Sequence, residues 1–218
     1  METYRRQMVP RSALIGWSLA AVICLVCPSA FSQTIIDEWS TVKVPPAPEL
    51  KTVKIVAKVT ALLMLDFNKQ TCNPERRPRC IASIPKVQKL LTEARAKGIP
   101  VIHSVSAGAV VGDIAKELAP LTEEPVVSSG PDKFLGTDLE RILKDRGIKT
   151  VIAVGTASHG AVLYTASGAA LRGMKVIVPV DGTSAENTYA EQYTCWHLLN
   201  APRISTLVTL TKIDSIEY

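Results

Sequence analysis

A continuous apolar run decides the fold class of this chain: Ala61-Leu62-Leu63-Met64-Leu65, followed directly by Asp66. Short runs rich in Val and Ile alternate along the sequence with segments of helical spacing. Buried strands joined by helices predict a parallel sheet covered on both faces, an α/β fold with six strands. The expected strands are residues 61–65, 99–105, 126–127, 150–154, 175–180 and 206–211, and the expected helices are residues 85–97, 138–146, 161–172 and 185–199.

Length and composition exclude several classes of protein. The chain has 218 residues, a formal net charge of +5 and 47% hydrophobic residues, which suits one domain with a sizeable core. This apolar content excludes a disordered or collagen-like chain. A polytopic membrane protein is excluded because only one apolar run approaches spanning length. The weak basicity comes without a stripe of aromatic and basic residues, so we expect no nucleic-acid partner.

The first 32 residues have the pattern of an export signal. A basic start precedes the mostly apolar residues 13–27, and the small residues Ala30 and Ser32 fit a cleavage site. An uncleaved signal anchor is the alternative, although the run is short for a membrane span. We expect a leader over residues 1–32, an N-terminal arm over residues 33–57 and one domain over residues 58–218. The mature protein would be periplasmic or secreted, with no stable membrane insertion.

Three cysteines remain after the leader. Cys72 and Cys80 enclose a short, polar, Pro-containing stretch, and an oxidising compartment favours a disulfide between them. The alternative, a metal-binding pair, lacks nearby His or further Cys ligands. Cys195 is then a lone thiol, expected to be packed rather than reactive.

Polar residues follow several of the expected strands, where open α/β sheets bind their ligands. Asp66 follows the first strand directly, and Lys133 follows the third. An ammonium would hold this carboxylate ionised, whereas burial would favour its protonated form, so the pair is a candidate for acid–base chemistry. A helix cap or a structural ion pair is the alternative for Asp66, and a solvated surface position is the alternative for Lys133.

The turn over residues 155–161 joins a buried strand to a helix. Its backbone N–H groups at the start of a helix can hold an oxyanion or a substrate carboxylate. The turn lacks the G-x-x-x-x-G-K-[ST] pattern of a phosphate-binding loop. His159 within it could contact a ligand, carry a proton or simply bond to the backbone of the turn.

Several motifs occur together in the order and spacing of one family, and over residues 58–202 the chain resembles the isochorismatase-like hydrolases. The motifs are Leu63-Met64-Leu65-Asp66-Phe67, Asp132-Lys133-Phe134 with Thr137 and Leu139, Val154-Gly155-Thr156-Ala157-Ser158-His159 with Thr165-Ala166, and Val180-Asp181. The resemblance implies a three-layer α/β/α fold with a six-stranded parallel sheet. It also implies a cis peptide bond at Thr156-Ala157.

The resemblance implies roles for Asp66 and Lys133 and a departure at Ala161. Amidases of the family use an Asp, a Lys and a Cys nucleophile, and Ala161 occupies the position of that Cys. A methyl group forms no covalent intermediate, so the thioester mechanism cannot operate there. The residues around His159 resemble the true isochorismatases, in which the Asp acts as a general acid on a vinyl ether. The resemblance assigns substrate binding to the turn residues Thr156, Ala157, Ser158, His159 and Gly160.

Phe67 and Phe134 are further candidates for the wall of the substrate pocket, although buried aromatic residues usually serve packing. We expect no cofactor and no metal, because the loop after Asp66 carries disulfide cysteines where some relatives bind a metal through histidines. The family commonly assembles through its helices, so we expect a homo-oligomer.

Three functions are compatible with these features. The first is an exported hydrolase that acts on a small polar molecule with a vinyl ether, amide or ester bond, without a Cys nucleophile. The second is a non-catalytic small-molecule binding protein on the same fold, and the third is a cysteine amidohydrolase whose nucleophile was replaced by Ala161. Export argues against isochorismate as the substrate, because siderophore synthesis takes place inside the cell.

Overall fold

A computed structural model of the chain describes residues 34–218. The chain divides into two units, residues 1–44 and residues 45–218, and each is described by itself. The expected leader, residues 1–32, lies outside the described residues. None of the helices within residues 34–218 combines the length and apolarity that a membrane crossing requires.

The described part of the first unit is short and exposed. It contains the helix α1 (Ile35–Glu38) and a single 3₁₀ turn over Trp39–Thr41. The apolar side chains of Ile36 and Trp39 are 82% and 74% exposed. The rest of the expected arm belongs to the second unit, where β1 (Val53–Lys54) pairs in parallel with β9 (Ile216–Glu217).

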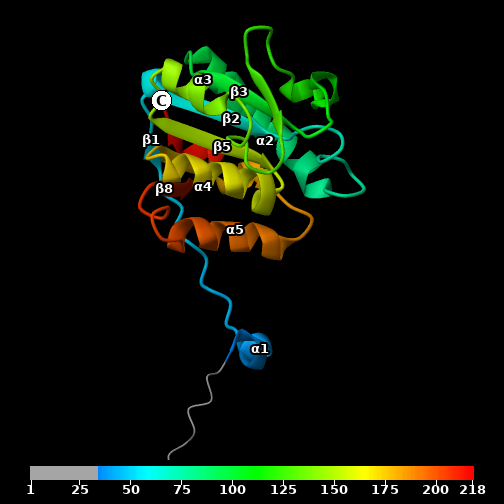
Figure 1. Cartoon of the computed structure of the whole chain (residues 1–218), viewed down its shortest axis with the longest axis vertical. Coiled ribbons are helices and arrows are strands. Elements are labelled where there is room, and N and C mark those ends of the chain that lie inside the picture. Colours follow the sequence, from blue (N-terminus) through cyan, green and yellow to red (C-terminus); the bar gives the residue numbers. More distant parts are fainter. Residues whose placement is uncertain (1–33) are drawn as a thin grey trace, which may run out of the picture. The chain divides into compact units, whose positions relative to one another are not determined.

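A parallel sheet forms the centre of the second unit (Figure 1). Its strand order is β4-β3-β2-β5-β6-β8, and the short strand β7 pairs with the end of β5. All of its strand pairs are parallel, as the alternation of apolar runs and helical segments predicts. The strands are β2 (Thr60–Leu65), β3 (Val101–Ser106), β4 (Val126–Ser129), β5 (Thr150–Thr156), β6 (Lys175–Pro179), β7 (Thr183–Ser184) and β8 (Val208–Thr211).

The sheet has seven strands, so the expected count of six is wrong. The additional strand β7 consists of one Thr and one Ser, and it has no apolar run that could reveal it in the sequence. It forms because the chain after β6 returns beside β5, where Gly155 pairs with Thr183 and Thr156 pairs with Ser184.

Helices cover both faces of the sheet, which confirms the three-layer architecture. They are α2 (Pro78–Ala96) on one face and α3 (Leu139–Asp145), α4 (Leu163–Leu171) and α5 (Thr188–Asn200) on the other. The alternating side chains of β2 supply both cores: Leu63 and Leu65 face α3, α4 and α5, whereas Leu62 and Met64 face α2.

The helix α2 begins at Pro78, seven residues before the expected start at Pro85. Pro78 occupies the first turn, where the missing N–H of proline costs nothing, and Pro85 is accommodated inside the helix. The sequence pattern marks Pro85 as the start because proline is favoured at the first position of a helix. The early start brings Cys80 into the buried face of α2.

Gly155 allows the central strands β2 and β5 to approach each other closely. Its φ is +150°, a conformation that side-chain-bearing residues rarely adopt. A Cβ atom at this position would lie 2.2 Å from the backbone oxygen of Leu65. The glycine is therefore required at the point where the chain leaves β5 for the turn over residues 156–161.

We expect Gly155→Ala to lower the free energy of unfolding by about 3 kcal/mol, because the added methyl group overlaps the backbone of β2. Gly173→Ala is the matched control: Gly173 also has a positive φ, +81°, but nothing lies within 4 Å of an added Cβ. This control should lose only about 1 kcal/mol. Urea unfolding followed by circular dichroism measures both, and equal losses would contradict the proposed contact.

Candidate active site

The sheet reverses its order of connection between β2 and β5. From β2 the chain proceeds to β3 and β4 on one side, and β5, β6 and β8 lie on the other side. Ligands of open α/β sheets bind at the carboxyl ends of the strands at such a switch point. Asp66 follows the end of β2, and Thr156 ends β5, so both residues lie at the switch point where a ligand is expected to bind.

The backbone of Asp66 turns sharply at the end of its strand. Its φ is +56°, in the left-handed region that Asp tolerates better than most residues. The backbone N–H of Asp66 donates to Ser104 of the neighbouring strand β3, and the hydroxyl of Thr71 donates to the backbone oxygen of Asp66. These contacts hold the carboxyl group at the edge of the sheet.

Both carboxylate oxygens of Asp66 are hydrogen-bonded. Oδ1 accepts from the hydroxyl of Ser104 at 2.7 Å, and Oδ2 lies 2.8 Å from Nζ of Lys133. The expected meeting of Asp66 and Lys133 is confirmed by this contact. Ser104 is the partner that sequence reasoning missed, although its place at the end of the adjacent strand was a usable signal.

Lys133 is completely buried, with 0% of its surface exposed. Besides Asp66, its ammonium contacts the backbone oxygens of Ser129 at 3.1 Å and Val105 at 3.5 Å. The backbone N–H of Lys133 donates to the hydroxyl of Thr165 on α4. Three acceptors therefore match the three protons of the ammonium, which is what a buried ion pair needs to persist. The interpretation of Lys133 as a solvated surface lysine is wrong.

The pKa of Asp66 is raised above its usual value. Burial is the largest cause, because it disfavours the charged form. The charge and hydrogen bond of Lys133, the hydroxyl of Ser104 and the charge of Arg77 act in the opposite direction. The carboxyl group thus retains its proton to a higher pH than a solvated Asp does.

The turn after β5 is buried except at His159 and Gly160, and it is tightly bonded. The peptide bond between Thr156 and Ala157 is cis, as the resemblance predicts. The hydroxyl of Thr156 donates to the backbone oxygen of Ser184 at 3.1 Å. The backbone oxygen of Ala157 accepts from Gly160 at 3.0 Å and from Val162 at 3.3 Å. The expected helix from residue 161 is preceded by a wide turn over Ser158–Val162, after which α4 begins at Leu163.

The remaining candidate residues differ in their burial and in the core to which they belong. Ala161 is 4% exposed, whereas His159 is exposed. Phe67 and Phe134 are buried in the two cores on opposite faces of the sheet, and the guanidinium of Arg172 lies 4.3 Å over the ring of Phe134. Substrate binding by these residues and by the turn stays a prediction.

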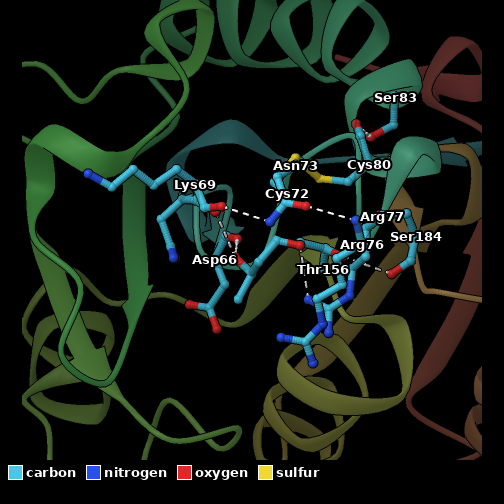
Figure 2. Close-up of a disulfide and its surroundings, with 12 residues drawn as sticks. Asp66, Lys69, Cys72, Asn73, Arg76, Arg77, Cys80, Ser83, Thr156 and Ser184 are labelled. Atoms are coloured by element: carbon cyan, nitrogen blue, oxygen red, sulfur yellow. Dashed lines mark hydrogen bonds between the residues drawn. A yellow bond between two sulfur atoms is a disulfide. The ribbon is translucent and has the colours of Figure 1, made fainter.

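A disulfide joins Cys72 and Cys80, as the spacing and compartment predict (Figure 2). It closes the loop that follows Asp66 and ends in the first turn of α2. Arg77 lies within this loop with only 5% of its surface exposed, although no sequence signal distinguishes it from its charged neighbours. Cys195 is partly buried on α5, and burial raises the pKa of its thiol, so the reactive thiolate is disfavoured.

The histidines have separate surroundings. Nε2 of His103 lies 3.0 Å from the carboxylate of Glu124, and Nδ1 of His197 lies 3.4 Å from the hydroxyl of Tyr193. Across residues 34–218, no group of three or more His, Cys, Asp or Glu side chains is arranged to hold a metal ion.

Comparisons with known proteins identify the family of this chain. The family model of the isochorismatase domain matches residues 60–211. The secreted isochorismatase effector Isc1 of Verticillium dahliae is 35% identical over 111 residues, which are 46% of this chain and 58% of the relative. The N-carbamoylsarcosine amidase of an Arthrobacter species is 27% identical over 124 residues, 44% of this chain and 47% of the relative. The match thus spans about half the length of these curated relatives.

Solved structures share the fold. An isochorismatase-like hydrolase from Alkaliphilus metalliredigens has a TM-score of 0.64 and 26% identity, and the match covers 71% of this chain and 95% of that one. An isochorismatase from Pseudomonas putida has a TM-score of 0.63 and 22% identity over 84% of this chain and 99% of that one. With its domain match over residues 60–211 and its parallel sheet, this chain belongs to the isochorismatase family.

Proposed function

We propose that this protein is an exported hydrolase that cleaves a vinyl ether, amide or ester bond in a small polar molecule without a thiol nucleophile. The observation that carries the proposal is the buried pair of Asp66 and Lys133 at the switch point of the sheet. Family membership supports the hydrolase class. Asp66 is the proposed proton donor, and Lys133 is the proposed electrostatic partner.

Among these substrates a vinyl ether is favoured, because its cleavage needs a proton donor and a water molecule but no nucleophile from the protein. Protonation of the double bond by Asp66 leaves an oxygen-stabilised cationic carbon and a carboxylate, which the ammonium of Lys133 stabilises. A water molecule then adds to the cationic carbon and gives one proton back to Asp66. Its second proton passes to the ether oxygen as the carbon–oxygen bond breaks, which releases an alcohol and a carbonyl product. No step requires a covalent bond to the protein, in keeping with the methyl group of Ala161.

Export is supported by three observations. The leader pattern, the disulfide between Cys72 and Cys80, and a relative whose name describes it as secreted all favour an oxidising compartment outside the cytoplasm. The name of that relative also combines secretion with isochorismatase. The argument from export against isochorismate therefore does not hold, and isochorismate belongs among the substrates to be tested.

The proposal is tested by incubating the purified, disulfide-intact protein with isochorismate, N-carbamoylsarcosine and a panel of simple amides, esters and enol ethers. We expect turnover to survive treatment with iodoacetamide, because Cys195 is the one thiol outside the leader and lies on α5. A thiol hydrolase treated in parallel serves as the control.

Two outcomes would contradict the proposal. Loss of turnover after alkylation would point to a thiol mechanism. Binding of panel members without product would point to the binding protein on the same fold. The homo-oligomer stays a prediction, to be checked by the molar mass in solution.

A further inference from the structure

Arg77 occupies an unusual position for an arginine in a surface loop. Its side chain is 6% exposed, and it is connected to Asp66 through a single residue. The hydroxyl of Thr71 donates to the backbone oxygen of Asp66, while the backbone oxygen of Thr71 accepts from Nη1 of Arg77 at 3.1 Å. The charge of Arg77 also lowers the pKa of Asp66. Arg77 therefore belongs to the surroundings of the proposed proton donor (Figure 2).

The charges around Arg77 do not balance. Nη2 of Arg77 lies 2.6 Å from Oε1 of Glu186, and Nε of Arg76 lies 3.1 Å from the same oxygen. The hydrogen bond from Arg77 is the main reason that the pKa of Glu186 falls to about 2, so Glu186 carries a full negative charge at neutral pH. Two guanidinium groups thus share one carboxylate, and the cluster has one positive charge in excess.

Several buried hydrogen-bond donors within the described residues lack partners. Nε of Arg77 is buried and has no hydrogen-bond partner, and the same holds for the hydroxyls of Ser158 and Ser184. Ser184 pairs with Thr156 at the end of β5, and Ser158 begins the turn after the cis peptide bond. Buried donors without partners are costly, and all three suit an oxygen-bearing, negatively charged ligand.

We propose that Arg77 is a specificity-determining residue that selects substrates bearing a carboxylate group and holds that group beside Asp66. The inference rests on the proposed function, because it assigns the substrate class of the same site. Arg77 would donate through its unpaired Nε, and the buried hydroxyl of Ser184, which also lacks a partner, is the proposed second donor. A hydrogen bond between two charged groups is stronger and more directional than one between neutral groups.

The loop around Arg77 is built to keep its side chain in place. The disulfide closes the loop between Cys72 and Cys80, and the backbone N–H of Arg77 donates to the backbone oxygen of Asn73 at 2.9 Å. Pro78 then begins α2. A guanidinium held in this way loses little conformational freedom when a ligand binds, which favours selectivity.

The test compares the binding of three carboxylic acids with that of their neutral methyl esters: benzoate, pyruvate and N-carbamoylsarcosine. Binding is measured at equilibrium by the shift in melting temperature and by ligand-observed NMR, in an Asp66→Asn background. The Asp66→Asn protein is expected not to turn over the ligands, so the measured binding does not depend on catalysis. We expect the acids to bind about tenfold more tightly than their esters.

Three variants assign the preference to Arg77. Arg77→Met should abolish the preference for acids, and Arg77→Lys should retain part of it. Arg79→Met is the matched control, because Arg79 lies in the same loop, pairs with Glu191 and is 52% exposed in its side chain. Glu186→Gln should tighten acid binding several-fold, since it removes the charge that neutralises Arg77. A damaged fold cannot produce such a gain.

The proposal is overturned if the acids bind no better than the esters, if no acid binds, or if Arg77→Met keeps the preference. If the preference for acids depends on Arg77 but the unchanged protein turns over no substrate, only the proposed hydrolase function is contradicted. Turnover without a preference for acids would contradict the role of Arg77 alone.

Discussion

Asp66→Asn is expected to lower kcat by about a hundredfold to ten-thousandfold, the usual contribution of a positioned general acid. The amide has nearly the shape of the carboxyl group and can still accept the hydrogen bond from Ser104. It has no acidic proton to donate. The measurement is the steady-state rate on the substrate identified in the panel, and the melting temperature verifies that the variant is folded.

Asp181→Asn is the matched control for this substitution. Asp181 also follows a strand of the sheet, β6, but its carboxylate accepts from the backbone N–H of Ile213 and pairs with Lys86. We expect its kcat to stay within about twofold of the unchanged protein, since surface ion pairs contribute little. Comparable losses in both variants would contradict a specific role for Asp66.

The activity of the unchanged protein should also fall as the pH rises through the raised pKa of Asp66.

Lys133→Met is expected to lower the free energy of unfolding by about 3–5 kcal/mol near neutral pH, because it leaves a buried carboxyl group without its cation. The substitution also removes the charge of Lys133, which is the largest of the causes that lower the pKa of Asp66, so this pKa rises further. An acid with a raised pKa in the folded state contributes its full stability below the unfolded pKa. That contribution is lost as the pH rises through the folded pKa. The loss in Lys133→Met should therefore be small near pH 3.8 and grow toward neutral pH.

Urea unfolding at several pH values measures this loss, and Lys144→Met is the control. Lys144 forms an exposed ion pair with Glu140 on α3, so its replacement should cost less than about 1 kcal/mol at every pH. In the double variant Asp66→Asn/Lys133→Met, the pH-dependent part of the loss should disappear, since no carboxyl group remains to titrate. A loss that is independent of pH in Lys133→Met would contradict the electrostatic explanation and indicate lost packing.

The layered fold and the pairing of Asp66 with Lys133 can both be predicted from the sequence. The apolar run over residues 61–65 is too short for a buried helix and is followed by a helical pattern, which is typical of a strand in a parallel sheet. Parallel strands place their carboxyl ends at one edge, so polar residues that directly follow such runs converge. Local periodicity carries this information because both sheet faces must be apolar.

Other features became visible only in the tertiary structure. β7 has no apolar residues, and it exists because Gly155 and Thr156 leave backbone groups for Thr183 and Ser184 to pair with. The start of α2 at Pro78 places Cys80 on the buried face of the helix, where it joins the disulfide, and local helix signals report neither feature.

The sequence by itself therefore determined the layers of the fold, the edge of the sheet at which Asp66 and Lys133 meet, and the methyl side chain at position 161. The tertiary structure decided the hydrogen bond from Ser104 to Asp66, the complete burial of Lys133 and the place of Arg77 beside the site. The physical reason is the distance along the sequence between the residues that determine each feature. Strand and helix patterns follow from neighbours within a few residues, whereas burial and the sharing of Glu186 by two arginines depend on segments about a hundred residues apart.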